Sequence, residues 1–218
     1  MITTTGIVPV IRASSAPKAL LAVDALRQGG ICIVEVTLTV PGAEEVIETL
    51  RKDSANGLLV GAGTVTDVEG AKRCLDAGAQ FIVSPGWDAG TVDFAKSRSV
   101  LMIAGALTPT EILSAWKSGA DLIKIFPCSS VGGANYIKSL RGPFPDIPFI
   151  PTGGVNLQTA ASFIQAGAEA LGVGGELVPS SALDANNPGI ISSLAKQFLE
   201  IVREARGMNK AAAAVEKG

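Results

Sequence analysis

Lys124 interrupts the apolar run "DLIKIFP" at residues 121–127. Of the eighteen Lys and Arg residues, it alone lies in the interior of a segment that is typical of a buried strand. Among the twenty acidic residues, only Glu35 in "CIVEVTL" is placed in a comparable way. Because burying two charges is costly and often adds no net stability, the pair indicates either a structural ion pair or a reaction centre.

A buried lysine can act as a nucleophile. Removal from water disfavours the charged amine and lowers the pKa of a lysine, and the neutral amine can attack a carbonyl carbon to form a Schiff base. The chain contains no histidine, which excludes Ser-His and Cys-His triads and any imidazole acid or base. We therefore predict that Lys124 is the nucleophile and that Glu35 transfers protons.

Strand parity extends this candidate site. Alternate residues of a strand share one face, so Glu35, Thr37 and Thr39 lie together and Lys124 shares a face with Phe126. Phe126 either keeps the amine dry or simply fills the interior of the fold. Thr64 in "GAGTV" either offers a hydroxyl to a ligand or caps the following helix.

The surrounding chain repeats one short plan. The segments "RQGGICIVEV", "DAGAQFIVSP", "KSGADLIKIF" and "QAGAEALGVG" each place a helix-ending glycine before an apolar run. Four further strand-like runs cover 7–11, 58–63, 100–105 and 148–152, with amphipathic stretches between them. Eight apolar strands alternating with helices predict a single-domain (β/α)8 TIM barrel of the α/β class, in which the site lies at the C-terminal ends of the strands.

The ends and composition of the chain restrict its possible partners. We expect the barrel to cover residues 1–206 and 207–218 to form a tail, either a frayed helix extension or disordered. A net charge of −2 without basic runs among aromatics argues against nucleic acid, and the lack of a long apolar stretch argues against a membrane and for a cytoplasmic protein. The spacing of the three cysteines supports neither disulfides nor a metal site.

Glycines follow the last two predicted strands. Gly153 and Gly154 lie in "PTGGVN", and Gly174 and Gly175 lie in "GVGG". Either pair alone is typical of a tight turn, but barrels often bind phosphate through backbone N–H groups at these two positions. The sequence therefore predicts a phosphorylated small-molecule substrate. "GAGTV" lacks the spacing of a dinucleotide fingerprint, so no cofactor is expected.

Taken together, "EVTLT", "VGAGTV", "FIVSPG", "IKIFP" and "GPFPDIPFIPTGGV" resemble the class I 2-keto-3-deoxy-6-phosphogluconate (KDPG) aldolases, which include 4-hydroxy-2-oxoglutarate aldolases. The resemblance runs from about residue 6 to 206. It implies a homotrimeric barrel that cleaves KDPG to pyruvate and glyceraldehyde 3-phosphate without a metal. It also implies that Lys124 forms the Schiff base and that Glu35 is the general acid and base. Further residues implied to bind substrate are Thr64, Pro85, Phe126 and Thr152 at the pyruvate, with the four loop glycines at the phosphate.

Two positions depart from the family pattern. The family often carries an arginine where this chain has Thr39, and a serine beside the glycines of the eighth strand where this chain has Gly175 and Glu176. A carboxylate facing a phosphate repels it. Arg12, at the end of the first predicted strand in "IVPVIRA", could replace the missing arginine and bind the substrate carboxylate together with Thr39 and Thr64, or it could be a surface arginine.

Other functions remain open at this point. Within the family, the substrate could be 2-keto-3-deoxy-6-phosphogalactonate, or the enzyme could be a broad 4-hydroxy-2-oxoglutarate aldolase. Outside it, the chain could be a non-catalytic barrel that binds phosphorylated metabolites, although the presence of both Lys124 and Glu35 argues against this. A phosphosugar isomerase or epimerase would not need a buried amine.

Overall fold

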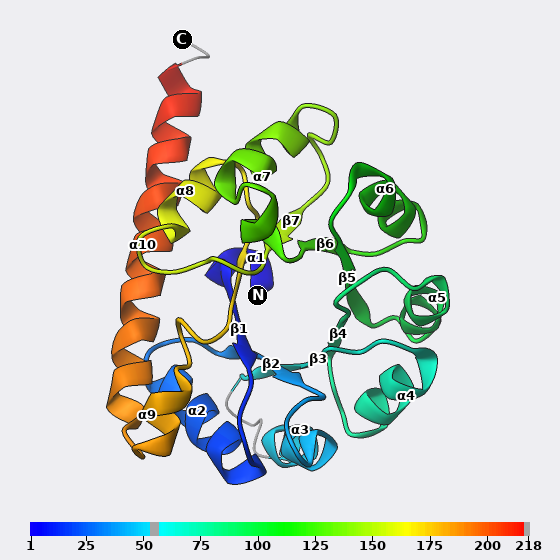
Figure 1. The fold of residues 1–218 in the computed structure, drawn as a ribbon, viewed down its shortest axis with the longest axis vertical. Coiled ribbons are helices and arrows are strands. Elements are labelled where there is room, and N and C mark those ends of the chain that lie inside the picture. The colour runs from blue at the N-terminus through cyan, green and yellow to red at the C-terminus, as the bar shows by residue number, and fades with distance from the viewer. Residues whose placement is uncertain (53–56, 216–218) are drawn as a thin grey trace.

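The computed structural model describes residues 1–52 and 57–215. Within these residues, eight parallel strands alternate with helices and form a nearly closed barrel (Figure 1). Each strand pairs with the next in sequence from β1 to β7, and β1 also pairs with β8. Between β7 and β8 the barrel is joined by a single bridge, Thr152 to Gly172. The predicted (β/α)8 architecture is confirmed.

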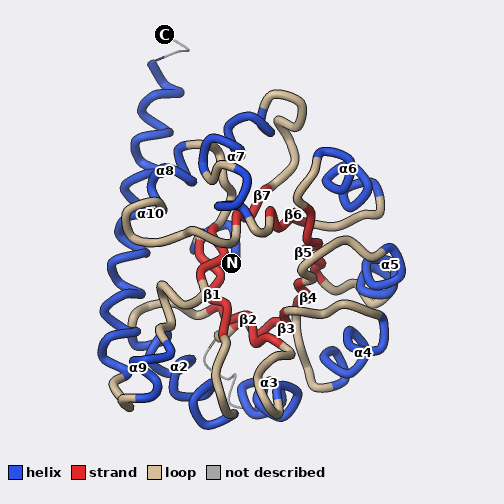
Figure 2. The backbone as a smooth tube through the Cα atoms, viewed as in Figure 1, coloured by secondary structure: helices blue, strands red, loops and turns tan. Residues whose placement is uncertain are grey.

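The strands form the inner ring and the helices the outer one (Figure 2). The strands are β1 (Ile7–Ile11), β2 (Ile33–Thr37), β3 (Leu59–Gly63), β4 (Phe81–Val83), β5 (Leu101–Ala106), β6 (Leu122–Ile125), β7 (Phe149–Pro151) and β8 (Leu171–Val173). The helices are α1 (Ile2–Thr5), α2 (Ala16–Gln28), α3 (Ala43–Lys52), α4 (Val68–Asp76), α5 (Ala89–Ser97), α6 (Pro109–Lys117), the 3-10 turn η2 (Cys128–Val131), α7 (Ala134–Arg141), α8 (Ala160–Gln165), α9 (Ser180–Asp184) and α10 (Pro188–Val215).

The four glycines of the repeated plan end helices as predicted. Gly30, Gly78, Gly119 and Gly167 all have φ between 92° and 99°, a left-handed conformation in which a Cβ would be strained. In each case the following N–H bonds back to a carbonyl five residues earlier, as Ile31 does to Leu26. These bonds satisfy carbonyls at the helix ends and turn the chain directly into the next strand.

Two hydrophobic layers enclose the strands. Outward-facing strand residues pack against the helices in the larger core. Inside the barrel a second cluster fills the half nearer the N-terminal ends of the strands, and its members include Ile33, Phe81, Leu122 and Ile150. Helix α1 covers that end, and its Ile2 belongs to the inner cluster. The open part of the barrel is therefore the C-terminal end of the strands, where the sequence predicts the site.

Helix α10 runs along the outside of the barrel beside α2 and α8 (Figure 1). Its buried face is formed by Ile191, Ala195, Phe198, Val202 and Ala205. The helix continues past residue 206, where the sequence places the start of a tail, to Val215, and residues 216–218 lie outside the described part. None of the helices in the described ranges is long and apolar enough to cross a membrane.

Candidate active site

Lys124 and Glu35 meet inside the barrel. Lys124 Nζ lies 3.6 Å from Glu35 Oε1, and the two side chains are only 4% and 3% exposed. Both point inward because they alternate with outward-facing residues of β6 and β2, strands on opposite sides of the ring (Figure 2). The phenyl ring of Phe126, two residues after the lysine, lies with its centroid 5.4 Å from Nζ. An amine and a carboxylate thus share a nearly dry space at the open end.

The electrostatics of Glu35 suit proton transfer. Burial raises the pKa of its carboxyl above the ordinary value, while the positive charges of Lys124 and Arg12 act in the opposite direction. Within the described residues, its Oε1 is buried without a hydrogen-bond partner. A carboxyl with a raised pKa can hold a proton closer to neutral pH, and an oxygen that is ion-paired but accepts no hydrogen bond can accept one from a substrate or a water.

Glycines open the space above the inner cluster. A Cβ on Gly63 of β3 would lie 2.0 Å from Glu35 Oε1. A Cβ on Gly105 of β5 would lie 2.2 Å from the carbonyl carbon of Pro85, and one on Gly172 of β8 would lie 2.1 Å from Thr152 Oγ1. Because these glycines have no side chains, the Glu35 carboxylate, the Pro85 backbone and the Thr152 hydroxyl can lie closer to the barrel interior. The sequence did not identify this function of the glycines.

The threonines of the β2 end are tied to one another. The buried Thr37 hydroxyl donates to the carbonyl of Ile11 at 2.9 Å and lies 2.7 Å from Thr39 Oγ1. Since the single Thr37 proton goes to Ile11, the Thr39 hydroxyl is the donor in the second bond. Thr39 is exposed, and because its proton points toward Thr37, it offers a ligand lone pairs rather than a proton.

Thr64 has an unusual backbone. Its φ is 59°, in the left-handed region that β-branched residues rarely adopt. The residue follows β3 directly and is partly buried. Such strain persists only where the surrounding structure imposes it, and it is concentrated at functional sites.

A cavity of about 180 Å³ lies at the mouth beside β7 and β8. It brings together most of the residues predicted for the distal part of the substrate. Its lining includes Arg12, Phe126, Thr152, Gly153, Gly154, Gly174, Gly175 and Glu176. Arg12 is exposed, and its charge acts on Glu35 deeper in the barrel.

A second cavity at the mouth, of about 300 Å³, lies on the other side of Phe126. Pro85 lines it together with Trp87 and Glu111, two residues that the sequence analysis did not select. One carboxylate oxygen of Glu111 accepts hydrogen bonds from the N–H groups of Leu107 and Thr108, as part of the cap of α6. Thr39 and Thr64 line neither of these two cavities.

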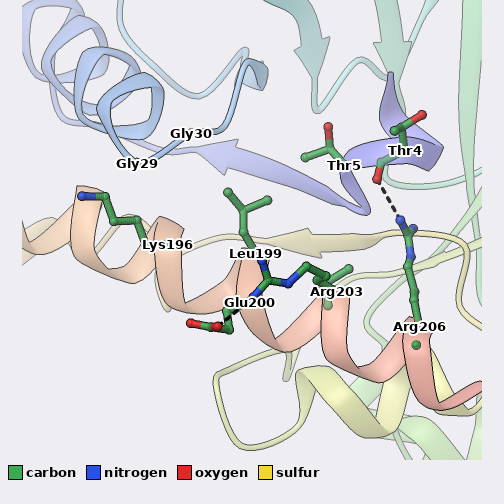
Figure 3. Close-up of a pocket in the computed structure, with 11 residues that line it drawn as sticks. Thr4, Thr5, Gly29, Gly30, Lys196, Leu199, Glu200, Arg203 and Arg206 are labelled. Carbon is green, nitrogen blue, oxygen red and sulfur yellow. Dashed lines mark hydrogen bonds and ion pairs between the residues drawn. The ribbon is translucent and has the colours of Figure 1, made fainter.

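A cavity larger than the two at the mouth lies elsewhere. It measures about 720 Å³ and lies on the outside of the barrel, where α10 passes α1 and the end of α2 (Figure 3). Arg206 is committed there to the backbone, because it donates to the carbonyls of Thr4 and Glu169. Arg203 is paired with Glu200. The lining of this outer cavity includes neither Lys124 nor Glu35, so the size of a cavity alone does not locate the reaction centre.

The comparison with protein families decides the assignment. Residues 1–194 match the model of the KDPG and KHG aldolases. The chain belongs to the KDPG and KHG aldolase family. The 2-dehydro-3-deoxy-phosphogluconate aldolase of Treponema pallidum is 35% identical over 197 residues, which cover 90% of this chain and 93% of that protein. The KHG/KDPG aldolase of Escherichia coli K12 is 32% identical over 201 residues, covering 92% and 93%.

A solved structure from the same family has the same fold. The KDPG aldolase of Legionella pneumophila, with pyruvate captured at low pH as a covalent carbinolamine intermediate, superposes with a TM-score of 0.84 and 28% identity. The match covers 91% of this chain and 98% of that one. As an aldolase family member, the chain is a carbon–carbon lyase. The predicted family and enzyme class are confirmed, while the roles of the individual site residues stay predictions.

Proposed function

We propose that this enzyme is a class I aldolase that cleaves 2-keto-3-deoxy-6-phosphogluconate to pyruvate and glyceraldehyde 3-phosphate through a Schiff base on Lys124. The observation that carries this proposal is the buried pair of Lys124 and Glu35 at 3.6 Å, at the open end of the barrel. A buried pair is weak as a stabilising device, because desolvation offsets much of its attraction. The free energy lost in burying the two charges is explained if the amine and the carboxylate take part in a reaction.

The proposed reaction uses one amine and one carboxylate. Lys124 Nζ attacks the C2 carbonyl to give a carbinolamine, which loses water to form an iminium that accepts electrons. Glu35, directly or through a water, removes the proton of the C4 hydroxyl, and the C3–C4 bond breaks to release the aldehyde and leave an enamine. Glu35 then protonates the enamine carbon, and water hydrolyses the iminium to pyruvate. The water lost in the first step is consumed in the last.

The substrate carboxylate requires donors once it leaves water. We assign it chiefly to Arg12, whose charge acts on Glu35 and which lines the cavity at the mouth. A guanidinium can hold a carboxylate through two parallel hydrogen bonds. Thr64 and Thr39 assist from neighbouring strand ends, Thr39 only after its hydroxyl turns away from Thr37. Pro85, Phe126 and Thr152 line the pyruvate end.

The distal phosphate is assigned to the backbone N–H groups of Gly153, Gly154, Gly174 and Gly175. All four glycines line the same small cavity as Arg12. Gly153 and Gly154 have positive φ values of 93° and 76°, which a residue with a side chain would rarely adopt. Backbone donors of this kind commonly bind phosphate at the last two strand ends of a barrel.

Closely related substrates share this machinery. The phosphogalactonate isomer differs at one carbon, and the KHG/KDPG name of the Escherichia coli relative favours 4-hydroxy-2-oxoglutarate as a second substrate. A non-catalytic metabolite-binding barrel is disfavoured because it would have no use for the buried pair. We also propose, from family membership, a homotrimer that acts in the cytoplasm and needs no metal or organic cofactor.

The decisive experiment is reductive trapping with pyruvate and borohydride followed by peptide mass analysis. We expect one added pyruvate-derived group, located on Lys124. Lys124→Ala should lose both trapping and turnover but remain folded, because the buried Glu35 carboxyl, left without its partner, can take up a proton instead of staying charged. Lys196→Ala, at an exposed position of α10, is the matched control and should behave as the parent does. Labelling of another lysine, or none, would refute the mechanism.

A further inference from the structure

Glu176 shares the small cavity at the mouth with the loop glycines. It is exposed, follows Gly175 directly, and lines the cavity together with Arg12. No ion pair within the described residues neutralises its carboxylate. Across that same part of the chain, the N–H groups of Gly154 and Gly174 donate to no protein acceptor. The cavity therefore combines free donors, one cation and one anion.

This combination of charges does not suit a dianion alone. A phosphate can accept bonds from the free amides, but it must then lie in a cavity of about 180 Å³ beside a carboxylate of the same sign. Because Arg12 is assigned to the carboxylate at the other end of the substrate, attraction to the phosphate comes from the backbone dipoles. A hydroxyl group has no such conflict, because it can donate to the carboxylate and accept from an amide.

We propose that Glu176 is a specificity-determining residue that reduces the advantage of a phosphorylated tail and allows unphosphorylated, polyhydroxylated 2-keto acids to be cleaved at the same site. This inference rests on the proposed function, since it concerns the distal end of a substrate whose C2 is bound to Lys124. The enzyme then accepts both kinds of tail, with the carboxylate of Glu176 binding hydroxyls and the glycine amides binding phosphate.

The test compares one substrate with and without its phosphate. In Glu176→Gln, which keeps the shape and removes the charge, kcat/KM for KDPG should rise and that for the same acid lacking the phosphate should fall. We expect the ratio of the two to increase by about tenfold, as removal of one nearby repulsive charge predicts. Glu204→Gln changes net charge equally at an exposed position of α10 and should leave the ratio as in the parent. A ratio in Glu176→Gln within twofold of the parent overturns the proposal.

A binding measurement separates this inference from the reaction mechanism. Titration calorimetry with inorganic phosphate should give a Kd about tenfold lower for Glu176→Gln than for the parent or Glu204→Gln. Equal Kd values overturn the role of Glu176, whether or not the protein is active. If phosphate binding changes as expected while pyruvate trapping at Lys124 fails, the mechanism is refuted and the role of Glu176 in anion discrimination stands.

Discussion

The carboxylate of Glu35 occupies the space that a side chain at residue 63 would fill. A Cβ placed on Gly63 would lie 2.0 Å from Glu35 Oε1 and 2.5 Å from its Cγ, closer than real Cβ contacts allow. Gly63 ends β3 and pairs with Thr37 of the neighbouring β2, so both backbones are held by the sheet. The position of the proposed acid and base therefore depends on a residue that takes no part in the reaction.

Gly63→Ala should displace the Glu35 carboxylate and reduce kcat by about a hundredfold, the loss expected for a shift of about 1 Å in a catalytic group. Gly61→Ala is the control on the same strand, since its Cβ would meet the ring of Phe81 at 2.3 Å rather than the carboxylate. It should lower the melting temperature with a smaller effect on kcat per folded molecule. Equal kcat values for the two variants, measured where both are folded, would contradict this positioning role.

Glu35→Gln should still form the imine but lose turnover by about 10²- to 10⁴-fold, because the amide fits the space and cannot transfer protons. Borohydride trapping with pyruvate measures the first property and aldehyde release the second. Glu204→Gln, which also removes one carboxylate, should retain both. The assignment fails if Glu35→Gln releases aldehyde at the rate of the parent.

The raised pKa of Glu35 predicts how stability varies with pH. In the window between its ordinary value of 4.5 and its higher folded value, the folded protein binds more protons at this site than the unfolded chain does. The free energy of unfolding contributed by Glu35 therefore falls as pH rises through that window. Urea denaturation from pH 4.5 upward should show this decline in the parent and a shallower one in Glu35→Gln. Parallel profiles would show that burial of Glu35 does not raise its pKa.

Arg12→Ala should raise KM for the substrate by at least about tenfold, since a carboxylate out of water loses its charged donor. Arg12→Lys should raise KM less because the positive charge remains. Arg203→Ala, an exposed arginine on α10 outside both mouth cavities, is the control. Unchanged steady-state kinetics in Arg12→Ala would leave the substrate carboxylate to the threonines and backbone amides.

Local sequence signals predicted the barrel because they act through the backbone. The left-handed glycines mark four helix ends. The N–H of the residue after each glycine bonds back to the helix, and this bond sets where the next strand begins. Helix α5 ends in the same way without a glycine: Ser99 has φ 55°, and the N–H of Val100 bonds to the carbonyl of Ala95. This helix end is not predictable from the sequence, because a serine, unlike a glycine, is no signal for a left-handed residue.

The candidate site was predictable where it depends on residue type and strand parity. Those two signals selected Lys124 and Glu35, which the structure brings to 3.6 Å. They could not show that Gly63, Gly105 and Gly172 make room for inward-leaning groups, because that depends on which distant residues surround each glycine. Likewise, the hydrogen bond from Thr39 to Thr37 depends on rotamers that the order of amino acids does not specify.

The closed lower half of the barrel has a kinetic consequence. Ile2 and the inner cluster, with Phe81 among its members, fill the interior below Lys124, so the mouth is the way in and out of the proposed site. In the proposed mechanism, pyruvate attached to Lys124 would lie deepest, with the aldehyde between it and solvent. Products must then leave in a fixed order, the aldehyde first and pyruvate last. In the synthetic direction pyruvate must bind first, and an aldehyde arriving early can only obstruct it.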